Sequence, residues 1–394
     1  MSEKKMRGLR ARLDYLLKHN HFVNKVFTFS VSLGMKCLGI FISIDKKMII
    51  FSGHSRRYND SPRALYEYLL ENNETYGTFK CVWALEDISQ SKYIPGNPIV
   101  VKSDTLKYFI YTLKAKYWVT CVNIERGLNY KKKGCRYLNT WHGIPLKAVG
   151  NDAGGRKDYN FESIDYFCYS GEYDKRIYKS AFNVKESALI PTGLPRNDCL
   201  YSTSAEDIKA IKKKLNLPLD KRIILYAPTW RDSTDRGRSC ELAPPINPTL
   251  WETELKDSYV VLFRMHAYTN KLTGIKFNNT LRDYSEYPDI NDLFKISDIL
   301  ISDYSASIVD FAILERPIIC FAYDYDSYKK DRGLYIDFTT DLPNGIIRTE
   351  RELLDCIHTM DYEDECKKTR FFLKSKMLTF GGDATKKCLD YLFS

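Results

Sequence analysis

The sequence lacks the short motifs that identify several large enzyme classes. Its 394 residues contain no Walker loop, no Gly-x-Gly-x-x-Gly fingerprint, no His-Glu-x-x-His pair and no Gly-x-Ser-x-Gly elbow. These motifs are typical of proteins that bind nucleotide phosphates, proteins that bind dinucleotides, zinc-dependent proteases and serine hydrolases, respectively. Their absence argues against the common forms of all four classes.

The cysteine pattern argues against a disulfide framework and against a zinc site. The eleven cysteines are odd in number and include no Cys-x-x-Cys pair. Several lie inside apolar runs, namely KCVWAL, YFCYS and PIICFAY. Cysteines in such runs are typical of reduced core residues in a cytosolic protein.

Length and charge narrow the class of protein further. A chain of 394 residues exceeds what one hydrophobic core usually supports, so we expect two domains. The composition is 44% hydrophobic and 28% charged, as in ordered globular proteins. The formal net charge of +10 favours an anionic partner, which is a nucleotide, a nucleic acid or a lipid headgroup.

The first 46 residues combine a basic segment with an apolar stretch. The basic residues are Lys4, Lys5, Arg7, Arg10, Arg12, Lys18 and Lys25. The apolar stretch from Val26 to Ile44 contains Lys36 and two serines, whereas a spanning helix needs roughly 20 mostly apolar residues. We expect residues 1–46 to form a basic amphipathic helical segment at an anionic membrane surface. A buried helix and a true membrane span are the alternatives.

From Met48 onward, short apolar runs alternate with helical patterns. The runs are MIIFSG, KCVWALED, PIVVK, KYWVTC, RYLNTW and YFCYSG, and the helical patterns include SPRALYEYLLENN and TLKYFIYTLKA. Short apolar runs without alternation are typical of parallel strands buried on both faces. Strands that alternate with helices predict a doubly wound α/β sheet.

The same pattern restarts near residue 195. The segment ALIPTGLPRND is followed by the helical run SAEDIKAIKKKLNL and by RIILYAPTWR, YVVLFRMH and DILISDYSASIVDFAILERPIICFAYD. We therefore predict two Rossmann-like domains, residues 47–195 and 196–394, after the segment 1–46. The facing strand ends of two such domains form a cleft in which ligands bind.

Two of the six histidines end predicted strands in different domains. His142 follows RYLNTW, with Gly143 behind it, and Arg264 and His266 follow YVVLF. A histidine is the side chain best suited to move a proton near neutral pH. Both histidines would face the predicted cleft, although a structural histidine at a strand end is the alternative for each.

A third group of polar residues lies where a strand gives way to a helix. Asp303, Ser305 and Ser307 precede an apolar-periodic helical run that continues to Leu314. A helix N-terminus offers unpaired N–H groups and a positive dipole end, which suit a phosphate group. The alternative is that Ser305 only caps the helix.

The motifs together resemble one known family. TWHGIPLK, TGLPRND, YAPTWR, RMH and ISDYSASIVDFAILERPI, in this order, are similar to the CDP-glycerol glycerophosphotransferases of teichoic acid and capsule synthesis. The resemblance covers the chain from about residue 48. It implies a GT-B-type fold of two Rossmann-like domains and an enzyme at the cytoplasmic face of the bacterial membrane.

The resemblance also implies roles for particular residues. It makes His142 the catalytic base and places His266 on the donor pyrophosphate. Ser305, Ser307 and Asp303 match the loop that holds the donor phosphates. Arg231, Arg196 and Gly143 match motif positions without an assigned role. From its charge, Arg264 is expected to stabilise the leaving CMP.

The predicted reaction moves a polyol phosphate, expected to be glycerol phosphate, from a CDP-polyol to a hydroxyl of a polyprenyl-diphosphate-linked or polyol-phosphate acceptor. The sequence is interpreted as having no Asp-x-Asp clamp, so we predict no metal and no cofactor. The short N-terminal segment favours a single or short-chain addition.

One rival is a GT-B glycosyltransferase that uses a UDP- or GDP-sugar. A second is a non-catalytic membrane or nucleic-acid binding protein, but no RNA-binding motif is present and we predict no nucleic-acid partner.

Overall fold

A computed structural model describes residues 20–154, 157–229, 245–265 and 275–394. Packing divides the chain into two compact units. Unit 1 comprises residues up to Trp141 together with 160–167 and 388–394, and unit 2 comprises 142–159 and 168–387. The linear boundaries expected at residues 46 and 195 stay predictions.

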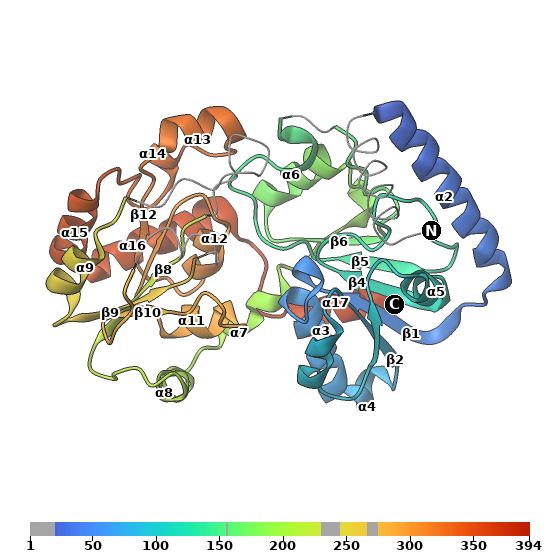
Figure 1. The fold of residues 1–394 in the computed structure, drawn as a ribbon, viewed down its shortest axis with the longest axis horizontal. Coiled ribbons are helices and arrows are strands. Elements are labelled where there is room, and N and C mark those ends of the chain that lie inside the picture. Colours follow the sequence, from blue (N-terminus) through green and yellow to red (C-terminus); the bar gives the residue numbers. More distant parts are fainter. Residues whose placement is uncertain (1–19, 155–156, 230–244, 266–274) are drawn as a thin grey trace, which may run out of the picture. The chain divides into compact units, whose positions relative to one another are not determined.

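The first sheet has the strand order of a Rossmann fold (Figure 1). Its strands, in chain order, are β1 (Asp45–Ser52), β2 (Lys80–Leu85), β3 (Ile99–Lys102), β4 (Ala115–Thr120), β5 (Arg136–Asn139), β6 (Tyr166–Tyr169) and β7 (Leu189–Pro191). Their spatial order is β3-β2-β1-β4-β5-β6-β7, and the pairs from β3 to β6 are parallel. Ile49, Ile50 and Phe51 of β1 have no exposed area, because both faces of the sheet are covered. All six apolar runs form parallel strands, as predicted, but the run PIVVK forms the edge strand β3, in which only Val101 is buried.

The helices of unit 1 include both of those predicted. They are α2 (His21–Phe41), α3 (Asp60–Glu71), α4 (Asn73–Tyr76), α5 (Leu106–Lys114) and the end of α17 (Ala384–Phe393). Pro62 lies in the first turn of α3, where a missing N–H is tolerated. Thr105 caps α5, and its Oγ1 accepts a hydrogen bond of 3.3 Å from the N–H of Tyr108.

The second sheet repeats the Rossmann order in unit 2. Its strands are β8 (Arg222–Tyr226), β9 (Tyr259–Phe263), β10 (Leu281–Asp283), β11 (Ile299–Ser302) and β12 (Ile318–Cys320). They lie in the order β10-β9-β8-β11-β12, and all pairs are parallel. The sequence did not predict β10, because only Leu281 of its three residues is buried.

Alternate residues of the second sheet enter two separate cores. Ile223 and Leu225 of β8 pack in the core that also contains residues of α11 and α12, whereas Ile224 and Tyr226 pack with residues of α9 and α15. The helices of unit 2 are α6 (Glu172–Phe182), α7 (Asp198–Tyr201), α8 (Ala205–Lys214), α9 (Pro248–Leu255), α11 (Ile290–Ile296), α12 (Ser307–Ala312), α13 (Tyr325–Arg332), α14 (Phe338–Asp341), α15 (Glu350–Thr359) and α16 (Tyr362–Phe372). Unit 2 is therefore a three-layer α/β structure.

The cysteines within apolar runs are core residues, as predicted. Cys81, Cys168 and Cys320 are buried free thiols. Burial raises the pKa of the Cys81 thiol to about 12, which keeps it protonated and unreactive at neutral pH.

Helix α2 has the reverse of the usual amphipathic pattern. The residues of α2 that are buried against the rest of unit 1 are small, namely Ser32 and Gly39. Its outward face carries the large apolar residues, among which Phe29 is 71% and Ile40 is 79% exposed. In Figure 1, α2 is the long blue helix at the outer edge of unit 1. Among the residues that the structure describes, no helix is long and apolar enough to cross a membrane.

Candidate functional site

The carboxyl ends of β8 and β11 form the topological switch point of the second sheet. Strand β8 has β9 on one side and β11 on the other, so the connections from β8 and β11 depart in opposite directions. The N–H of Ala227 donates to the carbonyl of Ile301 (2.9 Å), and the hydroxyl of Ser302 donates to the carbonyl of Ala227 (2.7 Å). These bonds bring together the loops of two predicted motifs, YAPTWR and ISDYSAS.

Asp303 joins the two loops from the inside. Its carboxylate is buried, and Oδ1 accepts hydrogen bonds of 2.7 Å from the N–H groups of both Thr229 and Tyr304. A carboxylate held by two backbone N–H groups orients the loops without offering those N–H groups to a ligand. The contacts favour a positioning role for Asp303, and its predicted contact with donor phosphates stays a prediction.

The two predicted serines lie side by side at the start of α12. The hydroxyls of Ser305 and Ser307 are 2.9 Å apart, and the N–H of Ser307 donates to Oγ of Ser305 at 3.2 Å. The N-cap of α12 is Ala306, and no side-chain hydrogen bond caps the helix, so the alternative that Ser305 only caps the helix is wrong. The two serine hydroxyls instead converge on one spot. Since α12 has only six residues, its dipole is small, and hydroxyl and N–H donors are the stronger anion-binding groups here.

The segment after β5 packs directly on residues 303–307, which are called the serine loop below. Gly143 has φ +139°, and a Cβ at this position would lie 2.8 Å from Cβ of Ala306, between the two serines. Ile144 and Leu146 are buried in the same core as Tyr304 of the serine loop. His142, which is half-buried, is therefore the neighbour of a glycine in contact with the serine loop.

Gly143→Ala is expected to lower the free energy of unfolding by about 1–3 kcal/mol. The substitution places a Cβ on a residue with positive φ, which strains the backbone, and this Cβ also clashes with Ala306. Urea denaturation measures this loss. Gly134→Ala is the matched control, since Gly134 also has a positive φ (+93°) but open space around the position of a Cβ. Equal losses in the two variants would show that the contact with Ala306 contributes nothing.

Arg196 connects three of the motifs within unit 2. Its Nη1 donates to the carbonyl of His142 (3.1 Å), and its Nη2 donates to Oδ2 of Asp310 in α12 (2.6 Å). Oδ1 of Asp310 accepts a second hydrogen bond from Nδ2 of Asn197 (2.7 Å). The side chains of Arg196 and Asp310 are only 16% and 7% exposed, so this is a mostly buried ion pair. It ties the backbone at His142 to the helix that follows the serines.

Asp310 is a site residue that the sequence reasoning missed. It lies inside the apolar run SIVDFAIL, and a lone carboxylate in a buried helix needs a cationic or hydrogen-bonding partner. That signal was available in the sequence, but it could not identify Arg196 and Asn197 as the partners.

The backbone before His142 is strained. Trp141 has φ +54°, which is uncommon for a bulky residue. Within unit 1, its N–H donates to Oδ1 of the buried Asn139 (2.8 Å), and Nδ2 of Asn139 donates to the carbonyl of Val122 (2.7 Å). Such strain persists only where surrounding contacts hold it, and it is common at functional sites.

Arg264 lies at the carboxyl end of β9, as predicted. Its Nη1 donates to the carbonyls of Tyr284 (3.2 Å) and Tyr287 (2.6 Å), so the guanidinium holds the loop that follows β10. Burial lowers the pKa of this guanidinium. Because the ordinary pKa of arginine lies far above neutral pH, the group stays charged. His266 and Arg231, the remaining predicted residues, lie outside the described residues.

The sequence does contain an Asp-x-Asp triplet, Asp324 to Asp326, which corrects the interpretation that it has none. Oδ1 of Asp324 accepts the hydroxyl of Tyr304 (2.9 Å), and Asp326 pairs with Arg348 (2.8 Å). Within the described ranges, no group of three or more His, Cys, Asp or Glu side chains is arranged to hold a metal ion. The absence of a metal from the reaction stays a prediction.

Comparison with known proteins finds relatives along almost the whole chain. The family model described as CDP-Glycerol:Poly(glycerophosphate) glycerophosphotransferase matches residues 35–394. The teichoic acid glycerol-phosphate transferase of Staphylococcus aureus is 35% identical over 336 residues, which cover 80% of this chain and 85% of that protein. The teichoic acid poly(glycerol phosphate) polymerase of Bacillus spizizenii is 30% identical, with 96% and 98% of the two chains covered.

A solved structure shows the same similarity in three dimensions. A variant of the wall teichoic acid polymerase TagF, soaked with CDPG, matches with a TM-score of 0.79 and 31% identity. The match covers 94% of this chain and 97% of that chain. These findings confirm the family resemblance of the motifs and the α/β fold with parallel sheets. The chain belongs to the CDP-glycerol:poly(glycerophosphate) glycerophosphotransferase family.

Proposed function

We propose that this protein transfers glycerol phosphate from CDP-glycerol to a hydroxyl group of an acceptor in teichoic acid synthesis, with release of CMP. Membership of the family and the names of the relatives support this reaction. The observation that carries it is the contact between Gly143 and Ala306, because it brings the His142 segment to the serine loop at the switch point of a Rossmann sheet. Nucleotide phosphates bind at such switch points.

The proposed chemistry is a substitution at the phosphorus atom that carries the glycerol group. The acceptor oxygen forms a new bond to this phosphorus, and the bond from phosphorus to the bridging oxygen of CMP breaks. The hydroxyl proton passes to the neutral imidazole of His142 as general base. The hydroxyls of Ser305 and Ser307 donate to the phosphate oxygens, while Arg264 and a protonated His266 balance the charge on CMP.

The test is CMP release by the purified protein in detergent, with a polyprenyl-diphosphate-linked saccharide as acceptor. We expect release from CDP-glycerol to exceed release from CDP-ribitol at least tenfold, a difference of about 1.4 kcal/mol in transition-state binding. Release of UDP or GDP from sugar nucleotides would instead support the glycosyltransferase alternative. If the protein neither turns over nor binds any CDP-polyol, the proposed function is wrong.

We further propose that the enzyme works as a peripheral protein at the cytoplasmic membrane surface, where it meets a lipid-linked acceptor. The exposed apolar residues of α2 that lie on one stripe support this location: Phe22, Val26, Phe29, Leu33 and Ile40. A soluble helix usually turns such residues toward the core, whereas an interfacial helix buries them among lipid headgroups. The GT-B arrangement of two facing Rossmann-like domains belongs to the same proposal.

The double variant Phe29→Ser/Leu33→Ser is expected to weaken binding to phospholipid vesicles about 10- to 100-fold, because it removes the apolar area that enters the membrane. Vesicle co-sedimentation measures the change. Ile88→Ser/Leu106→Ser is the matched control: these side chains of unit 1 are 54% and 69% exposed, against 71% for Phe29 and 52% for Leu33. The same loss in both double variants would contradict a specific role for α2.

A further inference from the structure

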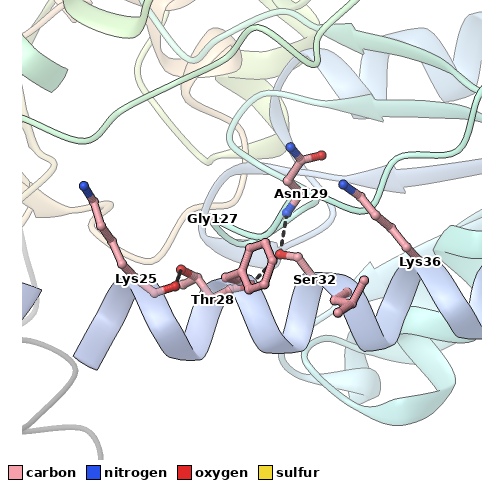
Figure 2. Close-up of a pocket in the computed structure, with 8 residues that line it drawn as sticks. Lys25, Thr28, Ser32, Lys36, Gly127 and Asn129 are labelled. Atoms are coloured by element: carbon pink, nitrogen blue, oxygen red, sulfur yellow. Dashed lines mark hydrogen bonds between the residues drawn. The ribbon is translucent and has the colours of Figure 1, made fainter. Parts of the chain in front are cut away.

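A pocket lies between α2 and the loop at residues 127–129, within unit 1 (Figure 2). Its volume is about 290 Å³, enough for a phosphorylated headgroup. Lys25, Ser32, Lys36 and Asn129 contribute polar groups to its wall, and none of the described residues that line it is acidic. The pocket is formed by residues that play no part in the proposed phosphoryl transfer.

The hydrogen bonds of Ser32 fix the floor of the pocket. Ser32 is 7% exposed, and its Oγ accepts the N–H of Asn129 (2.9 Å) while it donates to the carbonyl of Thr28 (2.5 Å). The bond with Asn129 joins the helix to the loop, and the bond to Thr28 within α2 orients the Ser32 hydroxyl for it, so the geometry of the pocket belongs to the folded unit. Nearby, Gly39 allows close packing, because a Cβ there would lie 3.2 Å from the side chain of Leu113.

Two lysines give the pocket its charge. Lys25 and Lys36 are about three turns apart, roughly 16 Å along the axis, and the helical period places them on the same side. Figure 2 shows both side chains extending on the side of the helix where the amide of Asn129 projects. In the part of the chain that the structure describes, neither ammonium group has an acidic partner within salt-bridge distance, whereas many other lysines do.

The apolar stripe of α2 borders the same pocket. Phe29 and Leu33 line it and are 71% and 52% exposed. A ligand that satisfies both the lysines and this stripe carries an anionic group beside an apolar chain. We propose that the pocket binds the phosphate headgroup of a membrane lipid, with the lipid chain against Phe29 and Leu33. The inference rests on the proposed membrane association and adds a defined headgroup site to it.

The experiment compares the full-length protein on phosphatidylcholine vesicles that contain either phosphatidic acid or phosphatidylglycerol, matched in zeta potential. Wild type is expected to bind the phosphatidic acid vesicles several-fold more tightly, because the exposed phosphomonoester enters the pocket and accepts hydrogen bonds from the lysines. Lys25→Gln/Lys36→Gln should lose this preference, with about 10- to 30-fold weaker binding, since each basic residue near an anionic surface contributes about 1 kcal/mol.

The matched control is Lys46→Gln/Lys107→Gln, which removes two exposed lysines of unit 1 outside the pocket. Equal weakening by the two double variants would mean diffuse attraction and overturn the headgroup site while membrane association stands. Failure of wild type to bind any vesicle would overturn both proposals. Displacement by inorganic phosphate at constant ionic strength would assign the pocket to a free anion and overturn the lipid assignment.

Discussion

His142→Ala is expected to lower the rate of CMP release from CDP-glycerol by about 10²- to 10⁴-fold, the usual contribution of a general base. Without the imidazole, the proton of the attacking hydroxyl loses its proposed acceptor. The backbone carbonyl that Arg196 holds is present in the variant as well, so the loop should keep its conformation. Turnover with saturating donor and acceptor measures the effect.

Binding of CDP-glycerol and the thermal unfolding midpoint distinguish a chemical defect from a folding defect. Both should stay near the wild-type values in His142→Ala. His358→Ala serves as the matched histidine control, because His358 lies on α15 and pairs only with the side chain of Glu254 at 3.1 Å among the interactions that the structure describes. If His142→Ala retained more than a tenth of wild-type turnover, His142 would not be the base.

Asp310→Ala should have the largest effect on stability, with a loss of about 3–5 kcal/mol in the free energy of unfolding. The substitution leaves the guanidinium of Arg196 mostly buried and without its carboxylate partner, which is the costly way to break a buried ion pair. It also removes the acceptor for Asn197. Since Arg196 holds the carbonyl of His142, turnover should fall even at temperatures where the variant is folded.

The control for this prediction is Asp326→Ala. Asp326 pairs with Arg348 at 2.8 Å, but the two side chains are 79% and 45% exposed, and exposed pairs contribute about 0–1 kcal/mol. Asp310→Asn keeps the shape of the side chain and one oxygen for hydrogen bonding but removes the negative charge. It therefore separates the effect of shape from the effect of charge. Chemical denaturation measures all three variants. A loss of less than 1 kcal/mol in Asp310→Ala would show that Arg196 finds another partner.

Local sequence was sufficient for most of the fold. Runs such as MIIF and CVWAL are apolar at consecutive positions, and this pattern by itself requires cover on both faces of a sheet. The run LRD of β10 has no such pattern, because this edge strand buries only Leu281, and it was not predicted. The family motifs, read in order, likewise identified the family without any structure.

Tertiary structure alone decided how the motifs meet. Gly143 and Ala306 are far apart in the chain, and the packing of Ile144 and Leu146 into the core that contains residues of α11 and α12 brings them together. The partners of Asp310, Arg196 and Asn197, likewise could not be predicted from the sequence, because they lie more than 100 residues away in the chain. The spacing of apolar residues along the chain indicates which faces of a helix or strand are buried, since this spacing depends on near neighbours in the chain. It does not indicate which distant residues share a contact, because that depends on how complete elements pack.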